Sequence, residues 1–142
     1  MRERLPVAVV VMFLLVALPG CGGGPTLATV SGRVTLDGKP LANAAVTFIP
    51  VPRPGSQVAG DSASGMTDEN GRFALRTYTV QGWKDGVQVG KHRVSISQQE
   101  TRGEGDRSVT IQKLPRRYNE ATELTADVAA GANQKDFELQ SR

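Results

Sequence analysis

This sequence of 142 residues has few of the side chains that build reactive or cross-linked sites, since it contains one cysteine and one histidine. A lone cysteine excludes an intramolecular disulfide, a C-x-x-C redox pair and a cysteine-rich metal cage. The lone histidine, His92, has no recognisable nucleophile and acid to complete a Ser-His-Asp set. The sequence also lacks G-x-x-x-x-G-K-[S/T], the loop that cradles nucleotide phosphates. We therefore predict a protein that is not an enzyme and that holds no cofactor or metal.

An excess of one charge is also missing. The chain has 17 Lys and Arg against 14 Asp and Glu, a net charge of +3, and the basic residues are spread along its length. A nucleic-acid-binding domain would instead gather them on one face. The densest basic group, Lys113 with Arg116 and Arg117, is expected to be a solvated loop. We predict no nucleic-acid partner.

Long apolar runs are absent except at the start, where Val7 to Leu18 is uninterrupted and follows Arg2 and Arg4. Twelve residues fit the core of a secretory signal peptide and fall short of the about 20 that cross a bilayer. Residues 1–20 are therefore predicted to be a cleaved signal peptide, and the protein to be exported.

The only cysteine lies directly after this run, in Leu18-Pro19-Gly20-Cys21. The tetrapeptide resembles the lipobox of bacterial lipoproteins, although those proteins usually have Ala, Ser or Thr where this chain has Pro19. The resemblance implies that Cys21 carries acyl chains such as palmitate and anchors the protein to a membrane of the cell envelope. Gly22 in place of an acidic residue favours the outer membrane where there are two. Cleavage by an ordinary signal peptidase is the alternative, and residues 21–28 are expected to form a glycine-rich tether.

The rest of the chain alternates apolar and polar residues over short stretches, which is the pattern of half-buried strands. Turn signals separate them at Asp37-Gly38, at 69–71, at Asp85-Gly86 and at 131–133. No stretch predicts a long helix, although residues 115–124 allow one short turn. We predict an all-β chain, a single antiparallel Greek-key β-sandwich of about seven strands over residues 29–140. The expected inward residues are Val30, Val34, Leu36, Val46, Phe48, Phe73, Leu75, Val94, Ile96, Leu124, Val128, Phe137 and Leu139.

Three stretches in order, VSGRVTLDGKPLANAAVTFIP, GMTDENGRFAL and GVQVGKHRVSIS, resemble the carboxypeptidase regulatory-like domains, which are relatives of the transthyretin-like sandwiches. The resemblance covers residues 29–98 and implies a non-catalytic module of the cell surface. The transthyretin-like sandwiches also include an enzyme family, the hydroxyisourate hydrolases. This chain lacks the several histidines and the C-terminal Tyr-Arg-Gly-Ser of those enzymes. The matching residues are Val30, Gly32, Val34, Asp37, Gly38, Pro40, Leu41, Ala44, Val46, Thr67, Asp68, Gly71, Phe73, Leu75, Gly90, His92 and Val94.

Two polar groups have a structural and a functional interpretation. His92 shares a strand face with Val94 and Ile96, which favours a packed imidazole over a general base. Asp68 and Asn70 are spaced like the start of a calcium loop, but the distal glutamate is missing, and a tight turn explains them more simply.

Binding residues are therefore sought in the connecting segments. Residues 50–65 and 98–108 are rich in Gly, Pro and polar side chains, and both are expected to be loops. Residues 77–86 differ because they carry Tyr78 and the only tryptophan, Trp83. Trp83 either stacks on a sugar ring or caps one open end of the sandwich. We predict a non-catalytic envelope lipoprotein with a structural or binding domain and an envelope protein or glycan as partner. The alternatives are a carbohydrate-binding accessory module and, less favoured, a small hydrolase.

Overall fold

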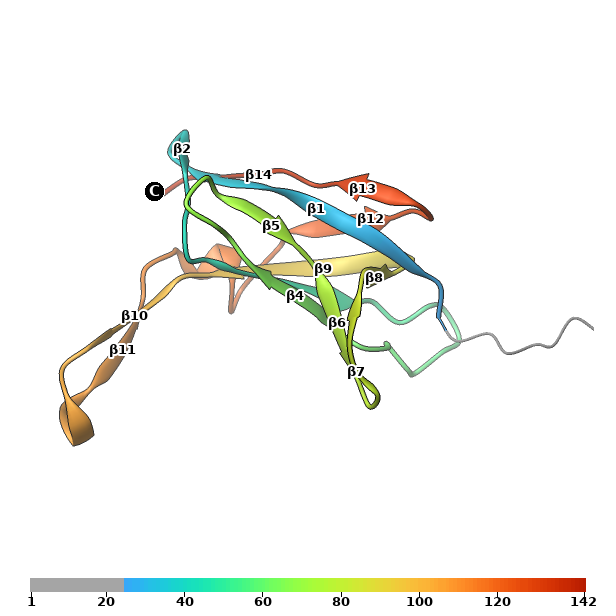
Figure 1. Cartoon of the computed structure of the whole chain (residues 1–142), viewed down its shortest axis with the longest axis horizontal. Helices are drawn as coiled ribbons and strands as arrows, with labels where there is room; N and C mark the ends of the chain where they lie inside the picture. The colour runs from blue at the N-terminus through green and yellow to red at the C-terminus, as the bar shows by residue number, and fades with distance from the viewer. Residues whose placement is uncertain (1–24) are drawn as a thin grey trace, which may run out of the picture.

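The computed structural model describes residues 25–142 (Figure 1). The predicted signal peptide, the lipidation site Cys21 and the first half of the tether, residues 21–24, therefore lie outside the described residues. Within the described part, no helix is long and apolar enough to span a membrane.

The first of two packed sheets is built around one long strand, β1 (Leu27–Leu36). Three strands pair with β1 in the antiparallel direction: β2 (Lys39–Pro40), β5 (Arg72–Ala74) and β8 (Val87–Gln88). The two strands nearest the C-terminus, β13 (Ala132–Gln134) and β14 (Phe137–Leu139), pair with it in parallel. Figure 1 shows β1, β2, β5, β13 and β14 along the upper part of the molecule, with β8 lower down near β6.

The second sheet is antiparallel throughout and has the order β12-β9-β3-β4-β6-β7. These strands are β12 (Thr125–Val128), β9 (Gly90–Ser97), β3 (Ala45–Pro50), β4 (Ala63–Met66), β6 (Arg76–Thr79) and β7 (Gly82–Asp85). A separate hairpin of β10 (Gln99–Arg102) and β11 (Val109–Gln112) projects from one end of the molecule (Figure 1). Two short 3₁₀ turns, η1 (Gly105–Arg107) and η2 (Arg116–Tyr118), complete the described chain.

The predicted all-β sandwich is thus confirmed, with more and shorter strands than the sequence suggests. The extra count arises where the chain passes from one sheet to the other. Leu75, for example, separates β5 of the first sheet from β6 of the second, and its amide donates to the Val30 carbonyl at 3.0 Å. Such corners let a single extended segment contribute to both sheets.

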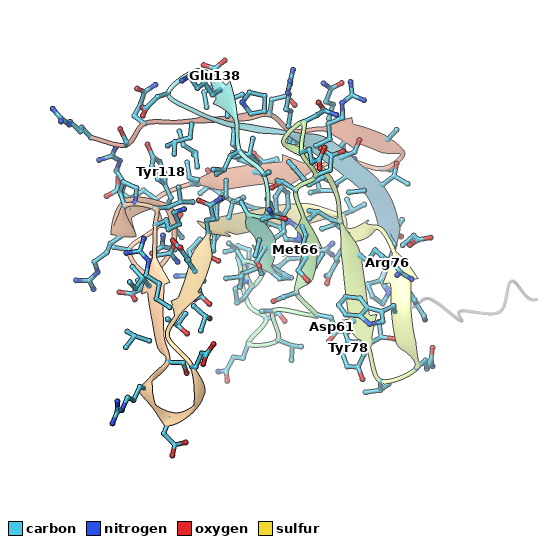
Figure 2. All side chains as sticks on the ribbon, turned by 60° about the vertical axis from the view of Figure 1, so that its left-hand side comes forward. Asp61, Met66, Arg76, Tyr78, Tyr118 and Glu138 are labelled. Carbon is cyan, nitrogen blue, oxygen red and sulfur yellow. The ribbon has the colours of Figure 1, made fainter. Side chains whose placement is uncertain are left out.

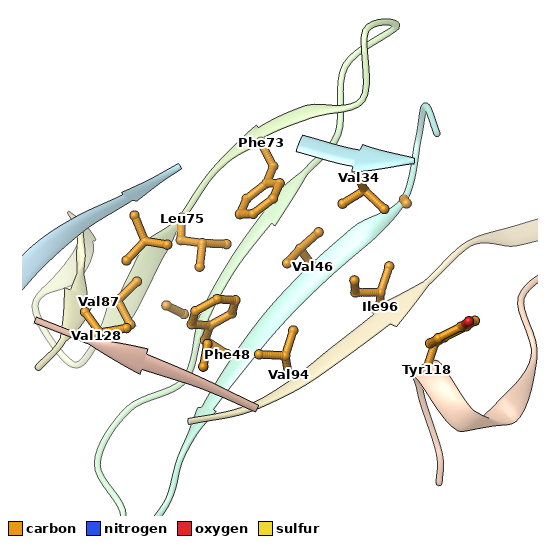
Figure 3. Packing of buried hydrophobic residues seen from close by; sticks show 14 of the residues in the cluster. Val34, Val46, Phe48, Phe73, Leu75, Val87, Val94, Ile96, Tyr118 and Val128 are labelled. Carbon is orange, nitrogen blue, oxygen red and sulfur yellow. The ribbon is translucent and has the colours of Figure 1, made fainter. Parts of the chain in front are cut away.

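The core lies between the two sheets and includes the residues predicted to face inward, together with others that were not predicted, such as Leu41, Val87 and Tyr118 (Figure 3). Phe48, Val94 and Ile96 are fully buried, and each contributes about 1.5 to 3 kcal/mol by leaving water. Phe137 is partly buried, with its ring centre 6.2 Å from those of Phe48 and Phe73. Of the other predicted inward residues, Leu36 and Leu124 are partly buried against the core, and the remaining ones are buried.

Two turn predictions are confirmed by the backbone. Asp37 and Gly38 both have positive φ, 51° and 80°, as a two-residue turn between β1 and β2 requires. In the turn before β5, the Asp68 carboxylate accepts hydrogen bonds from the amides of Asn70 and Arg72, both at 2.9 Å. The Asp68 segment is therefore a tight turn. A short helical turn, η2, also lies within the stretch where one is expected.

The prediction for residues 98–108 is wrong in part. The stretch is not a plain link, since residues 99–102 form β10 and pair with β11. The sequence does not predict this hairpin, because none of its residues is buried. The alternation of buried and exposed positions that reveals core strands therefore does not reveal β10 and β11. Residues 51–62 are without strand, as expected, but β4 takes up the end of the predicted loop.

Candidate functional site

The outward face of the second sheet carries a row of polar residues at matching positions. Strand register places Ser95, Thr47 and Ser64 side by side on β9, β3 and β4, and continues to Arg76 and Asp85 on β6 and β7. These five residues alternate with core residues such as Val46 and Val94, so they point away from the core. With strands about 4.8 Å apart, the row extends about 19 Å across the sheet.

The two predicted contact residues, Tyr78 and Trp83, come together near one edge of this face. They are direct cross-strand neighbours on β6 and β7, with ring centres 5.2 Å apart and an angle of 64° between ring planes. Tyr78 is 63% exposed and Trp83 is 53% exposed. Trp83 therefore does not cap the core, and both rings are open to solvent.

An ion pair and a cation–π contact of Arg76 lie beside the tryptophan. The Arg76 Nε atom lies 2.8 Å from Asp85 Oδ1, and the Arg76 guanidinium carbon lies 5.8 Å from the centre of the Trp83 ring. Arginine over a tryptophan face is attracted by the ring quadrupole. The exposed ion pair itself contributes little to stability.

A shallow depression of about 350 Å³ lies beside Trp83. Its volume is at the lower end of the roughly 300 to 1,000 Å³ of small-molecule sites. Ser64 and Ala45 belong to its floor by register, while the longer side chains of Met66, Arg76 and Trp83 surround it. Figure 2 shows Met66, Arg76 and Tyr78 on the same side of the ribbon. The hairpins β6–β7 and β10–β11 both project to this side of the sandwich (Figures 1 and 2).

His92 lies away from this face, within the sandwich. Its side chain is 1% exposed, and its ring centre is 5.7 Å from that of Phe48. Nδ1 lies 3.0 Å from the Gly90 carbonyl oxygen, whereas Nε2 is buried with no hydrogen-bond partner. Burial lowers the pKa of His92 from its ordinary 6.5, and the Gly90 hydrogen bond and the charge of Asp127 oppose this only in part. The packed imidazole predicted from the sequence is what the structure shows.

Residues 25–142 offer no cluster of metal-binding side chains. In that range no three His, Cys, Asp or Glu side chains lie close enough together to hold an ion. The Asp68 Oδ1 atom, considered as a calcium ligand, is instead the acceptor of the turn amides described above.

Sequence reasoning names Tyr78 and Trp83 but misses the rest of this site. Arg76, Ser64 and Thr47 are ordinary surface residues by type, and only strand register reveals that they share a row with each other. The alternation of apolar and polar residues does identify which side chains face outward, because these lie between the predicted core residues. That signal does not say which strands are neighbours.

No family model and no curated protein matches the sequence. The resemblance to carboxypeptidase regulatory-like domains therefore stays a prediction.

Three solved structures share a low level of similarity with this chain. A candidate carbohydrate-binding protein from Pseudomonas aeruginosa is 13% identical, with a TM-score of 0.43 over 80% of this chain and 89% of the other. A DUF3823 family protein from Parabacteroides merdae is 15% identical, with a TM-score of 0.40 over 81% of this chain and 46% of the other. A 9R-lipoxygenase from Cyanothece is 18% identical, with a TM-score of 0.39 over 81% of this chain and 16% of the other.

Proposed function

We propose that this protein is a non-catalytic, lipid-anchored protein of the cell envelope that binds carbohydrate on the outward face of its second sheet. The observation that carries the proposal is the exposed aromatic pair Tyr78 and Trp83 beside the depression at Ser64. The sandwich is proposed to be of the carboxypeptidase regulatory-like kind on the sequence motifs alone.

The chemistry of this face suits a sugar. An aromatic ring offers a flat apolar surface for the C–H face of a pyranose, and both rings here are more than half exposed. Sugar hydroxyl groups need donors and acceptors nearby, which the Arg76 guanidinium, the Asp85 carboxylate and the Ser64 hydroxyl supply. The row from Ser64 through Thr47 to Ser95 extends these hydroxyl groups across the sheet. A longer glycan would therefore find partners beyond the first ring.

An envelope protein is the second candidate partner, and a separate observation favours it. Val109 is 60% exposed and Ile111 is 39% exposed on β11, where they occupy the same face of a projecting hairpin. Exposed apolar residues on a projecting element favour protein contacts. On the sheet face the two aromatic rings lie beside hydroxyl and charged side chains, which makes carbohydrate the better candidate there.

The anchor and the lack of catalysis are proposed on separate grounds. Two or more acyl chains on Cys21 would hold the protein on a membrane, at about 0.8 kcal/mol per buried methylene. Against catalysis, the only imidazole is enclosed by the core and has the Phe48 ring as a neighbour. Turnover of a small ester, amide or ureide that is lost in a folded His92→Ala variant would contradict this part of the proposal.

The binding test uses the full-length protein, extracted in detergent, on a glycan array and then in titrations with the strongest oligosaccharide. Trp83→Ala should weaken binding at least tenfold, about 1.4 kcal/mol, because it removes the stacking surface. Arg76→Ala should also weaken binding, while Val109→Ala on the far hairpin serves as a matched control and should bind as the parent does. Equal affinities for all three variants would sink the assignment.

The anchor is tested by intact-mass measurement of the protein purified from membranes. Cys21→Ser should abolish the added acyl mass and either release the protein or leave the precursor uncleaved. Acyl chains retained in the Cys21→Ser variant would refute the lipidation site.

A further inference from the structure

We propose that one end of the sandwich, the end at which Pro25 enters it, rests directly on the membrane surface. Exposed valines of two neighbouring segments would contact the lipid headgroup region there, and basic side chains beside them would reach anionic headgroups. This inference rests on the Cys21 anchor of the proposed function.

Three segments surround the point where the described chain begins. Pro25 shares one surface depression with Val51 and Val58 of the strandless segment 51–62, and another with Val80 at the tip of the β6–β7 hairpin. It shares a third with Ala130, which lies between β12 and β13. Figure 1 shows the chain entering at the end opposite the β10–β11 hairpin and the C-terminus.

The length of the connection keeps this end near the lipid. Only Gly22, Gly23 and Gly24 separate Cys21 from Pro25. At no more than about 3.6 Å per residue, four steps reach at most about 14 Å. The headgroup layer of each leaflet is itself about 5 to 7 Å thick. An acylated Cys21 therefore holds the Pro25 end within reach of the headgroups.

Three exposed valines lie at this end, among polar side chains. Val80 is fully exposed and Val58 is 78% exposed, although both are aliphatic. Val51, beside them, is 42% exposed. Single exposed apolar residues are common, but these three share depressions with Pro25, the first described residue after the glycines. These side chains leave water when they enter the headgroup region of the membrane, which is favourable for apolar surface.

Charge at this end has the sign that suits a bacterial membrane surface. Arg53, Lys84 and Lys91 line the same depressions as Pro25, and Asp61 is the acidic residue among those lining groups. Anionic headgroups attract basic side chains within about a Debye length. A lipid surface is thus favoured over an acidic or neutral protein partner because it satisfies the valines, the basic excess and the short tether together.

This orientation leaves the proposed sugar site open. The strands β9 and β3 run along the long axis of the molecule, which connects the Pro25 end to the β10–β11 end (Figure 1). With the Pro25 end on the membrane, the outward face of the second sheet is parallel to the membrane normal and faces sideways, away from the lipid. A glycan bound along the row from Ser64 to Ser95 would then lie roughly parallel to the membrane plane.

The test measures the depth of spin labels on the full-length acylated protein in vesicles of three parts phosphatidylcholine to one part phosphatidylglycerol. Labels are placed by Val58→Cys and Val80→Cys, with Glu104→Cys beside the β10–β11 tip as the matched control. Acylated Cys21 leaves no other thiol in the chain. Labels at 58 and 80 should collide more with oxygen dissolved in lipid than with a water-soluble nickel complex. The label at 104 should show the reverse.

Three outcomes would overturn this inference in distinguishable ways. If mass measurement finds no acyl chain on Cys21, the anchor of the proposed function fails, and the orientation fails with it. If Cys21 is acylated but labels 58 and 80 are as accessible to nickel as label 104, only the orientation is wrong. The third outcome is that labels 58 and 80 are exposed in pure lipid and become shielded only when envelope protein is added. That result would assign this end to a protein partner and overturn the proposal.

Val58→Glu with Val80→Glu provides a second measurement that does not depend on labels at these sites. The acyl chains should keep this double variant on the vesicles, so flotation should be unchanged. A label at Ser56→Cys should nevertheless become more accessible to the nickel complex than in the valine parent. Val109→Glu, at the other end, should leave that label unaffected. An unchanged Ser56 label in the double variant would contradict direct contact.

Discussion

At the scale of single residues, His92 stands out as a polar group enclosed by the core. Its Nδ1 atom is paired with the Gly90 carbonyl, so the neutral ring carries its proton there and leaves Nε2 as an unpaired acceptor. An unsatisfied buried acceptor costs about 1 to 3 kcal/mol. Protonation would add a second cost, because the charged ring would be enclosed beside Phe48.

His92 makes stability depend on pH in a definite direction. Its pKa is below 6.5 in the folded protein, chiefly because of burial, so the unfolded chain binds the proton more readily. The free energy of unfolding therefore rises with pH in this range. We expect the contribution from the neutral ring to be fully present above pH 6.5 and lost as the pH falls through the folded pKa. Urea unfolding between pH 5 and 7.5 measures it.

The matched variant for this prediction is His92→Leu, which has similar volume and cannot titrate. Its unfolding free energy should change less between pH 7.5 and 5 than that of the parent. Asp37 and Glu100 do not blur the comparison, because hydrogen bonds from Ser141 and Arg102 lower the pKa of each carboxyl from values already near 4. Parallel pH profiles for parent and variant would show that His92 is not the titrating group.

At the scale of elements, β1 depends on a glycine in its middle. β1 pairs first with β13 and then with β14, and Gly32 lies between the two ladders. A Cβ on Gly32 would overlap the Lys135 carbonyl, which the chain brings close where it passes from β13 to β14. Between the two ladders a side chain takes the place of a backbone acceptor: the Arg33 amide donates to Asp136 Oδ1 at 2.9 Å.

The β10–β11 hairpin is expected to be dispensable for folding. It contributes no buried residue, and its ion pairs between Glu100 and its neighbours Arg102 and Lys113 are exposed. Replacing residues 100–111 with a short glycine-asparagine turn should leave the melting temperature within a few degrees of the parent, because exposed ion pairs contribute little. A thermal melt followed by circular dichroism checks this. A large loss would show that the hairpin packs on the sandwich.

The sequence predicts strand faces well and strand partners poorly. Phe48 and Ile96 are recognisable as inward residues because a period of two places alternate side chains on one side. That period does not predict that β1 pairs in parallel with β13 and β14, which come about 100 residues later in the chain. The choice of partner strand depends on contacts along the whole chain. The candidate site follows the same rule. Trp83 is identifiable by residue type, whereas its association with Ser64 requires the register of β4, β6 and β7.

At the scale of the whole molecule, the sandwich is closed by joining its first strand to its last. The Asp37 amide donates to the Leu139 carbonyl, and the Asp37 carboxylate accepts from the Ser141 amide. From the η2 turn, the Tyr118 hydroxyl accepts from the Gln140 amide at 2.9 Å. Arg117 donates to the carbonyls of Gln140 and Arg142 at 2.7 and 2.8 Å. These contacts hold β14 against β1, so cooperative unfolding should involve both ends of the domain.

Removal of residues 137–142 should therefore unfold the whole sandwich. The deletion takes away Leu139, which is 1% exposed, and Phe137, whose ring packs near Phe48 and Phe73. Truncating one such side chain costs about 2 to 5 kcal/mol, and losing both approaches the about 5 to 15 kcal/mol that stabilises a typical domain. The amide proton exchange of β3 and β9, in the middle of the other sheet, should accelerate to the rate of an unfolded chain. Deleting only 141–142 is the matched control; it removes two exposed hydrogen bonds, to Asp37 and from Arg117, but no core side chain, and should preserve slow exchange. Slow exchange in β3 and β9 after the longer deletion would mean that the second sheet is stable without the strand that closes the first.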